Sequence, residues 1–207
     1  MIAIIDYGRG NLGSVEKAFG RVGMRAVVTD DPRVVEDAEA VVLPGDGAFH
    51  DAMANLERLG LVAPLARALT GGRPFLGICL GYQLLFSTSE EFGQGRGLDV
   101  IPGVVGRFPA GRKIPHMGWN QVRHAGDMRL FEGIPDGAHF YFVHSYYPVP
   151  GAADASLRVA WCEYGVRFAA AIERGPIFAT QFHPEKSQRW GLRLLENFAA
   201  LVKAPVA

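Results

Sequence analysis

The sequence contains little cysteine. Cys79 and Cys162 are its two thiols among 207 residues, and they do not form a Cys-x-x-Cys pair. A disulfide framework, a zinc finger or an iron–sulfur cluster needs more thiols than this. We therefore expect no metal and no other cofactor, a reducing cytoplasmic setting, and a fold held together by its apolar core.

Net charge and long apolar runs are also lacking. The 21 Lys and Arg residues balance the 21 Asp and Glu residues. A nucleic-acid partner is not expected, because proteins that bind nucleic acid usually carry a basic face. The longest apolar stretch, residues 75–86, contains two glycines and a glutamine and is far shorter than the roughly 20 residues of a membrane helix. The apolar run at the N-terminus ends at Asp6 without a basic region, so we expect neither a signal peptide nor a membrane partner.

The first half of the chain alternates apolar runs with helical periodicity. Leu12, Val15 and Phe19 form a stripe typical of an amphipathic helix. The continuous apolar runs are typical of buried parallel strands: Ile2–Ile5, Ala26–Thr29, Ala40–Leu43 and Pro74–Ile78. This order predicts an α/β fold with a doubly wound, mostly parallel, flavodoxin-like sheet.

The second half predicts short strands and turns. We expect strands at residues 104–108, 120–123, 139–144, 157–163, 166–172 and 176–182. Tyr164-Gly165 predicts a hairpin turn. A closing helix should follow Ser187 as its N-cap. These strands predict an antiparallel β extension of the sheet, and no linker divides the chain, so residues 1–207 are expected to form one domain.

Gly77-Ile78-Cys79-Leu80-Gly81 follows a predicted buried strand and precedes a predicted helix over residues 82–86. A nucleophile elbow has this pattern, because small neighbours allow a sharp turn that exposes the central side chain. The helix N-terminus would favour a thiolate at Cys79, and the backbone amide of Leu80 could stabilise an oxyanion. A buried structural cysteine is the simpler alternative, but it leaves the two glycines unexplained.

A general base is predicted at the end of a later strand, in Phe182-His183-Pro184-Glu185. Glu185 could hold the His183 imidazole in the tautomer that takes a proton from sulfur. On its own, this segment could equally be a surface histidine beside a solvated glutamate. The glycine-rich turn over residues 44–49 follows another predicted strand, and its amides, with Asp46 among them, could supply the second oxyanion donor.

A glycine pattern and a pair of histidines concern two other kinds of site, for a dinucleotide and for a metal. Gly8, Gly10 and Gly13 fit the dinucleotide-binding pattern G-x-G-x-x-G, with Asp30 near the place of a ribose-binding acid. A dinucleotide-binding protein therefore remains an alternative. His139 and His144 are five residues apart on one predicted strand, so they should face opposite sides and make poor metal ligands.

Taken together, the elbow and the distant Phe-His-Pro-Glu resemble the class I, triad-type glutamine amidotransferases. Within that family, two segments resemble the glutaminase subunits of imidazole glycerol phosphate synthases: Asp6-Tyr7-Gly8-Arg9-Gly10-Asn11-Leu12 and Pro115-His116-Met117-Gly118-Trp119-Asn120. The resemblance covers nearly the whole chain. It implies one amidotransferase domain that hydrolyses glutamine through a thioester and passes ammonia to a (β/α)8-barrel cyclase subunit in a heterodimer.

The resemblance also implies roles for individual residues. Cys79 would be the nucleophile, His183 the general base and acid, and Glu185 its orienting partner. The residues that would bind glutamine are Gly47, Gln83, Glu91, Ser145 and Tyr146, and those that would face the cyclase are Trp119, Tyr141 and Lys186. Two residues depart from the family pattern. Asp46 stands where Val is frequent and could disfavour an oxyanion, and Tyr82 replaces a frequent Met.

Three functional alternatives stay open on the sequence alone. A glutaminase subunit of another synthase, such as anthranilate synthase, would share the elbow and the base. A thiol hydrolase or stress protein of similar fold would have the cysteine without glutamine chemistry. A dinucleotide-binding protein would instead use the loop of Gly8, Gly10 and Gly13.

Overall fold

The fold begins with four short parallel strands made mostly of apolar residues. In the computed structural model, which describes residues 1–151 and 154–203, they are β1 (Ile2–Ile5), β2 (Ala26–Thr29), β3 (Ala40–Leu43) and β4 (Phe75–Ile78). β1, β3 and β4 are fully buried, as expected for continuous apolar runs covered on both faces. The four strands lie where the sequence predicts them, except that Pro74 precedes β4.

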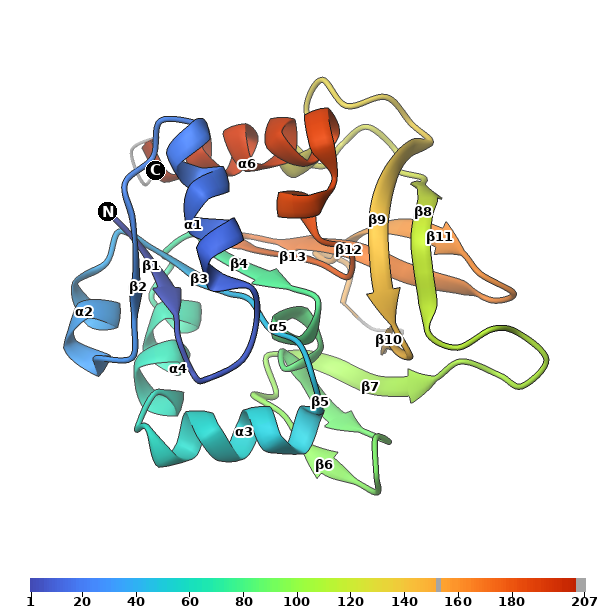
Figure 1. Ribbon diagram of the computed structural model, residues 1–207, viewed down its shortest axis with the longest axis horizontal. Helices are drawn as coiled ribbons and strands as arrows, with labels where there is room; N and C mark the ends of the chain where they lie inside the picture. The colour runs from blue at the N-terminus through green and yellow to red at the C-terminus, as the bar shows by residue number, and fades with distance from the viewer. Residues whose placement is uncertain (152–153, 204–207) are drawn as a thin grey trace.

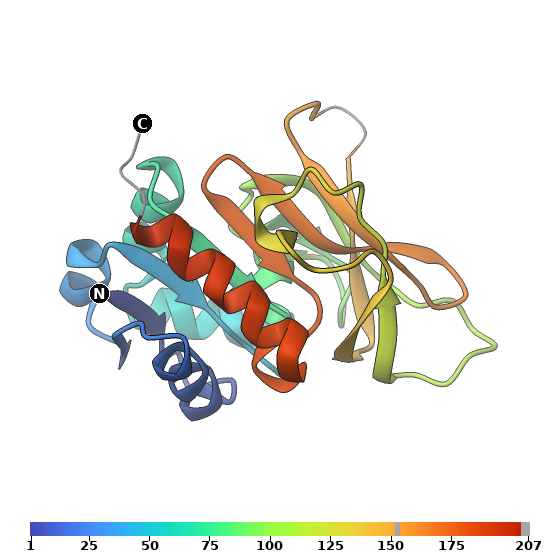
Figure 2. The ribbon, with the colours of Figure 1, turned by 90° about the horizontal axis from the view of Figure 1, so that it is seen from above.

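Helices cover both faces of the sheet (Figures 1 and 2). The helices are α1 (Leu12–Arg21), α2 (Pro32–Asp37), α3 (Phe49–Arg58), α4 (Val62–Thr70) and α6 (Gln188–Lys203). Side chains of α1 and α6 pack in one core with Ile2 and Ile4, whereas those of α2, α3 and α4 pack in a second core with Ile5. The predicted doubly wound arrangement is confirmed.

Strands from the second half of the chain complete the main sheet. The strand order is β11-β12-β13-β4-β3-β1-β2, with β11 (Arg158–Glu163), β12 (Arg167–Arg174) and β13 (Ile177–Thr180). β13 is parallel to β4, while β12 and β11 are antiparallel neighbours joined at the predicted Tyr164-Gly165 turn. The antiparallel extension is therefore confirmed for β11 and β12.

The other strands form two smaller sheets. One has the order β10-β7-β5-β6, from β5 (Phe86–Ser89), β6 (Gly95–Arg96), β7 (Ile101–Arg107) and β10 (Tyr146–Pro150). The second is the antiparallel pair β8 (His116–Val122) and β9 (Ala138–His144). Two 3-10 turns complete the elements, η1 (Arg129–Phe131) and η2 (Pro184–Lys186). No helix in the described part of the chain is long and apolar enough to cross a membrane.

Two local predictions were wrong. The helix after the elbow, α5, covers only Leu80–Gln83, because the Leu84 and Leu85 carbonyls accept from Leu98 and Ile101 and the chain turns into β5. Ser187 directly precedes α6, as the sequence predicts, and its carbonyl accepts from the Gly191 amide, but its hydroxyl makes bonds elsewhere instead of capping the helix. The hydroxyl accepts from the Tyr141 amide and donates to the His183 carbonyl.

Candidate active site

The site lies where three adjacent parallel strands end. β3, β4 and β13 are neighbours in the sheet, and their carboxyl ends lead into the residue 44–49 turn, into Cys79 and into His183. Ligand sites of open α/β sheets occupy this edge. Segments far apart in the sequence therefore meet at one place.

Cys79 has the strained backbone of an elbow. Its φ of 55° and ψ of −106° are rare for a residue with a side chain. A Cβ at Gly81 would overlap the Leu43 carbonyl, and one at Gly77 would lie 2.9 Å from the Gly81 carbonyl oxygen. The two glycines therefore permit the close approach of β3, β4 and α5, as the sequence predicts. With only one turn, however, α5 can give the sulfur little of the dipole expected from a longer helix.

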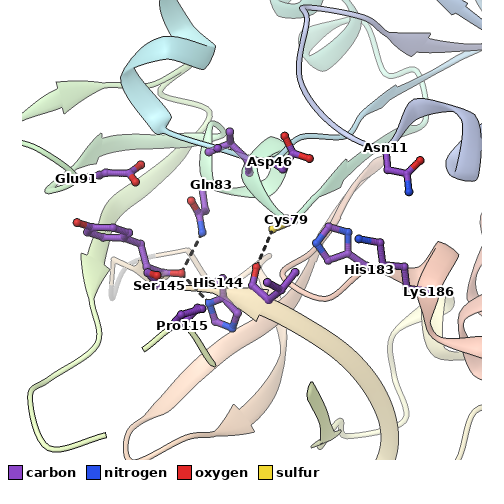
Figure 3. A pocket seen from close by; sticks show the side chains of 14 residues that line it. Asn11, Asp46, Cys79, Gln83, Glu91, Pro115, His144, Ser145, His183 and Lys186 are labelled. Atoms are coloured by element: carbon purple, nitrogen blue, oxygen red, sulfur yellow. Dashed lines mark hydrogen bonds between the residues drawn. The ribbon is translucent and has the colours of Figure 1, made fainter. Parts of the chain in front are cut away.

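Cys79 opens into a cavity of about 450 Å³ (Figure 3). Many of its lining residues were singled out in the sequence analysis. They are Asp46, Gly47, Leu80, Gln83, Glu91, Ser145, Tyr146, His183 and Lys186, and the cavity also includes Asn11, Pro115, Val143 and His144. The structure therefore brings together the candidate nucleophile, the base and all five residues that resemble a glutamine site.

His183 is held by Glu185 and faces Cys79. Its Nδ1 lies 2.8 Å from Glu185 Oε1, and both side chains are buried. Its Nε2 is also buried and has no hydrogen-bond partner among the described residues. Burial lowers the pKa of His183, but the nearby Cys79 sulfur and Glu185 outweigh it and raise this pKa to about 10. At neutral pH this favours the protonated imidazolium form of His183.

The Asp46 side chain is turned toward the N-terminal loop. Its Oδ1 accepts from the Gly10 amide at 3.1 Å, and Figure 3 shows the carboxylate on the side of Asn11. The Asp46 carboxylate therefore points away from the elbow and accepts a hydrogen bond there. In this orientation it does not oppose an oxyanion near Cys79. Tyr82, the other departure, is fully buried against Phe86 beneath the elbow.

Glu91 and Gln83 already make contacts with the protein. Glu91 Oε2 accepts from the Phe49 amide at 2.7 Å at the start of α3. Gln83 Nε2 donates to the Tyr146 carbonyl and to Gln181 Oε1, both at 3.0 Å. These bonds fix the two side chains before any ligand enters the cavity.

The comparisons with known proteins agree with this geometry. Residues 3–202 match the family model described as glutamine amidotransferase class-I. The chain belongs to this family. It is 58% identical over 202 residues to the imidazole glycerol phosphate synthase subunit HisH of Moorella thermoacetica, covering 98% of this chain and 95% of that protein. It is 53% identical over 204 residues to the protein of the same name from Methanothermobacter thermautotrophicus, covering 99% and 100%.

Solved amidotransferase structures share the fold at lower identity. A crystal structure titled glutamine amidotransferase superimposes with a TM-score of 0.76 at 20% identity, covering 99% of this chain and all of that one. The structure of PurLQS from Thermotoga maritima gives 0.76 at 18%, covering 98% of each chain. The predicted fold class, including its amidotransferase character, is confirmed.

The dinucleotide alternative is not favoured in a class I amidotransferase, and the loop itself shows why. The Gly8 amide donates to Asp6 Oδ1 at 2.8 Å, and the Gly10 amide donates to Asp46. A pyrophosphate would need such amides free, and would meet both carboxylates. The Gly10 amide instead connects this loop to the residue 44–49 turn.

The residues predicted to face a partner lie beside the cavity. Trp119 on β8 is opposite Tyr141 on β9, with ring centroids 6.1 Å apart, and neither lines the cavity. Lys186 does line it. His139 and His144 point to opposite sides of β9, as predicted, and the described residues contain no group of three or more potential metal ligands.

Sequence reasoning missed a buried polar group next to the sulfur. Gln181 is fully buried, and its Nε2 lies 3.6 Å from Cys79 Sγ. His116 and His144 were also overlooked as a bonded pair. A polar Gln ending an apolar strand two residues before His183 was the available signal for Gln181. No local pattern predicts the histidine pair, since its members lie on different strands.

Proposed function

We propose that this chain is the glutaminase subunit of an imidazole glycerol phosphate synthase, and that it makes ammonia for histidine biosynthesis. The observation that carries this proposal is the elbow cysteine beside the His183–Glu185 pair in one cavity, in a chain so similar to HisH subunits. We assign Cys79, His183 and Glu185 as the catalytic triad.

The first half of the reaction releases ammonia. The Cys79 thiolate attacks the side-chain carbonyl carbon of glutamine, and the negative charge moves to the carbonyl oxygen. The backbone amides of Leu80 and the Asp46-Gly47 turn would hold that oxyanion. The His183 imidazolium then gives its proton to the departing nitrogen. The C–N bond breaks, ammonia leaves, and a γ-glutamyl thioester remains on Cys79.

The second half regenerates the enzyme. Neutral His183 takes a proton from water, and the hydroxide adds to the thioester carbonyl. When the C–S bond breaks, glutamate leaves and the thiolate is again paired with an imidazolium. Glu185 stabilises the imidazolium in both halves through its bond to Nδ1.

The cavity supports a lengthwise pose for glutamine. In Figure 3, Glu91 lies at one end and Cys79 with His183 at the other, with Gln83 and Ser145 between them. The free oxygen of Glu91 suits the α-ammonium of glutamine, while the Ser145 and Tyr146 segment and Gly47 line the sides. The side-chain amide of the substrate then reaches the sulfur.

The names of the relatives support a proposal for the partner. We propose a heterodimer with a (β/α)8-barrel cyclase subunit that receives the ammonia and makes imidazole glycerol phosphate and AICAR. Trp119, Tyr141 and Lys186 are proposed to face it, and residues 1–207 are proposed to act as a single amidotransferase domain. A subunit serving anthranilate synthesis is not favoured by the similarity to HisH proteins.

The experiment measures glutamate formed from glutamine by the purified chain, alone and with a barrel cyclase subunit and its phosphoribosyl nucleotide substrate. We expect glutamate formation in the complex with the wild-type chain. The Cys79→Ala variant should form no glutamate, and its melting temperature should equal that of the wild type. Cys162→Ala is the matched control, because that buried thiol lies outside the cavity. Glutamate production by Cys79→Ala would contradict the mechanism, and activity indifferent to the cyclase would contradict the assigned partner.

A further inference from the structure

A directed chain of hydrogen bonds ends on the nucleophile. Gln181 Nε2 lies 3.6 Å from Cys79 Sγ, within reach of a hydrogen bond to sulfur, and Gln181 Oε1 accepts from Gln83 Nε2 at 3.0 Å. Gln181 directly follows β13 and is fully buried, so its amide cannot turn toward solvent. The oxygen of Gln181 is committed to Gln83, and its N–H groups are therefore left for the sulfur.

The orientation of Gln83 is fixed in turn. Both of its acceptors, Gln181 Oε1 and the Tyr146 carbonyl, are oxygens, so the Gln83 nitrogen must lie between them. A flipped Gln83 would place oxygen against oxygen at both contacts. A flipped Gln181 would likewise present oxygen to the thiolate and nitrogen to the Gln83 nitrogen.

A histidine pair anchors the far end. The Tyr146 carbonyl lies 2.8 Å from His144 Nδ1, and His144 Nε2 lies 3.0 Å from His116 Nδ1. A carbonyl can only accept, so His144 carries its proton on Nδ1 and accepts at Nε2 from His116. Asn120 Nδ2 then donates to His116 Nε2 at 3.2 Å. Burial lowers the pKa of His116 to about 4 and that of His144 to about 3, which keeps both rings neutral and in these tautomers.

We propose that Gln181 is a further catalytic residue, whose side-chain N–H donates to the Cys79 thiolate, and that Gln83, the Tyr146 carbonyl, His144 and His116 hold it in that orientation. This deepens the proposed glutaminase function and rests on it. The neutral Gln181 amide would then donate to a sulfur that also lies near the His183 imidazolium. A hydrogen bond to a charged acceptor is about twice as strong as a neutral one.

The bond to Gln181 also determines which atom of Gln83 can bind a ligand in the cavity. With both N–H groups of Gln83 used, its Oε1 is the atom left to accept from a ligand. Gln83 is therefore a positioning residue for Gln181 and an acceptor for a donor group of the substrate.

The test measures the thiolate without requiring glutamine. The rate of Cys79 alkylation by iodoacetamide is followed from pH 5 to 10 in wild type, Gln181→Met and Gln181→Glu. Met keeps the length but cannot donate, and Glu keeps the acceptor for Gln83 but places a carboxylate near the sulfur. Cys162 does not interfere, since burial raises its pKa to about 12. The other titratable side chains around the cavity and the sulfur are the same in all three proteins: Tyr7, Asp46, Glu91, His144, Tyr146, His183, Glu185 and Lys186.

We expect the midpoint of alkylation to rise by about one pH unit in Gln181→Met, which is about a tenfold loss of thiolate below the midpoint, and to rise further in Gln181→Glu. Gln121→Met, on the exposed side of β8, should leave it unchanged. His144→Phe should also raise the midpoint, by less, while His139→Phe on the exposed face of β9 should not. An unchanged midpoint in a folded Gln181→Met protein would overturn the proposal.

Nuclear magnetic resonance of the wild type covers the case of a variant that does not fold. The side-chain amide protons of Gln181 should move downfield as the thiolate forms, and should not move over the same pH range in Cys79→Ala. Equal titration in both proteins would overturn the proposal. If the wild type makes no glutamate in any mixture yet shows these shifts, the glutaminase function fails while the thiolate donor stands.

Discussion

At the residue scale, the strongest steric requirement lies at Gly81. A methyl group there would overlap the Leu43 carbonyl, and β3 cannot withdraw because it is paired on both sides. We expect Gly81→Ala to lower the free energy of unfolding by at least about 3 kcal/mol, the upper range for overpacking a rigid site. Gly13→Ala is the matched control, because nothing lies near that exposed position of α1. It should raise stability by about 0.5–1 kcal/mol. Urea unfolding measures both, and equal stability of the two variants would contradict this account.

The sequence indicated which residues form the candidate site, but it did not indicate which contacts they make with other loops. Cys79, with its flanking glycines, was predictable because a strained elbow needs small neighbours on both sides. His183 and Glu185 were predictable because they follow a strand in a short segment. The position of Asp46 was not, since its hydrogen bond to Gly10 joins loops that only the folded sheet brings together.

At the element scale, β8 and β9 carry a buried neutral histidine pair, and this makes the structure sensitive to acid. Both folded pKa values lie below the 6.5 of an unfolded histidine. The unfolded chain therefore binds more protons between pH 6.5 and about 3 to 4, and stability falls as the pH is lowered through that window. Each histidine should lower the free energy of unfolding by up to about 1.4 kcal/mol per pH unit.

The measurement is the free energy of unfolding in urea at several pH values from 7 to 4. In His116→Gln the free energy of unfolding should fall less steeply with decreasing pH, by the contribution of one histidine. The glutamine amide can donate and accept hydrogen bonds without taking up a proton. His139→Gln, on the exposed side of β9, should keep the wild-type slope. A wild-type slope in His116→Gln would count against a neutral buried pair.

Elements with strong local patterns were predictable, and those set by pairing were not. β1 and β3 match their apolar runs because the same residues that favour strands also fill the core, and the half-buried residues of β2 pack against that core. β5 was missed because Phe86 continues the helical pattern from Tyr82. Its strand conformation depends on β7, whose residues come later in the chain. β8 begins at His116, four residues before the strand that the sequence predicts at 120–123. The segment was missed because His116, Gly118 and Asn120 do not form the apolar face of an alternating strand pattern.

At the scale of the whole molecule, β8 presents an apolar surface. Met117 and Trp119, two residues apart on one face, are 60% and 47% exposed. Neighbouring exposed side chains of this size mark contact surfaces, and tryptophan is a frequent hot spot. We expect Trp119→Ala to weaken cyclase binding about thirtyfold, which corresponds to a hot-spot loss of about 2 kcal/mol, while its melting temperature stays within about 2 °C of wild type.

Calorimetric titration of the cyclase into the chain checks this. Phe92→Ala is the matched control, because Phe92 is also a highly exposed aromatic residue but belongs to the turn between β5 and β6. Equal weakening by both substitutions would indicate a general loss of apolar surface, and undiminished binding by Trp119→Ala would remove β8 from the interface.

The strand order also has a consequence for synthesis. β13 completes the main sheet between β4 and β12, and 102 residues separate Cys79 from Gln181. At translation rates of about 5–20 residues per second, a nascent chain holds its cysteine for roughly 5–20 seconds before its base emerges. An unfinished or truncated chain therefore contains Cys79 without His183. If these residues act as proposed, such a chain neither activates the thiol nor consumes glutamine before β13 and His183 are in place.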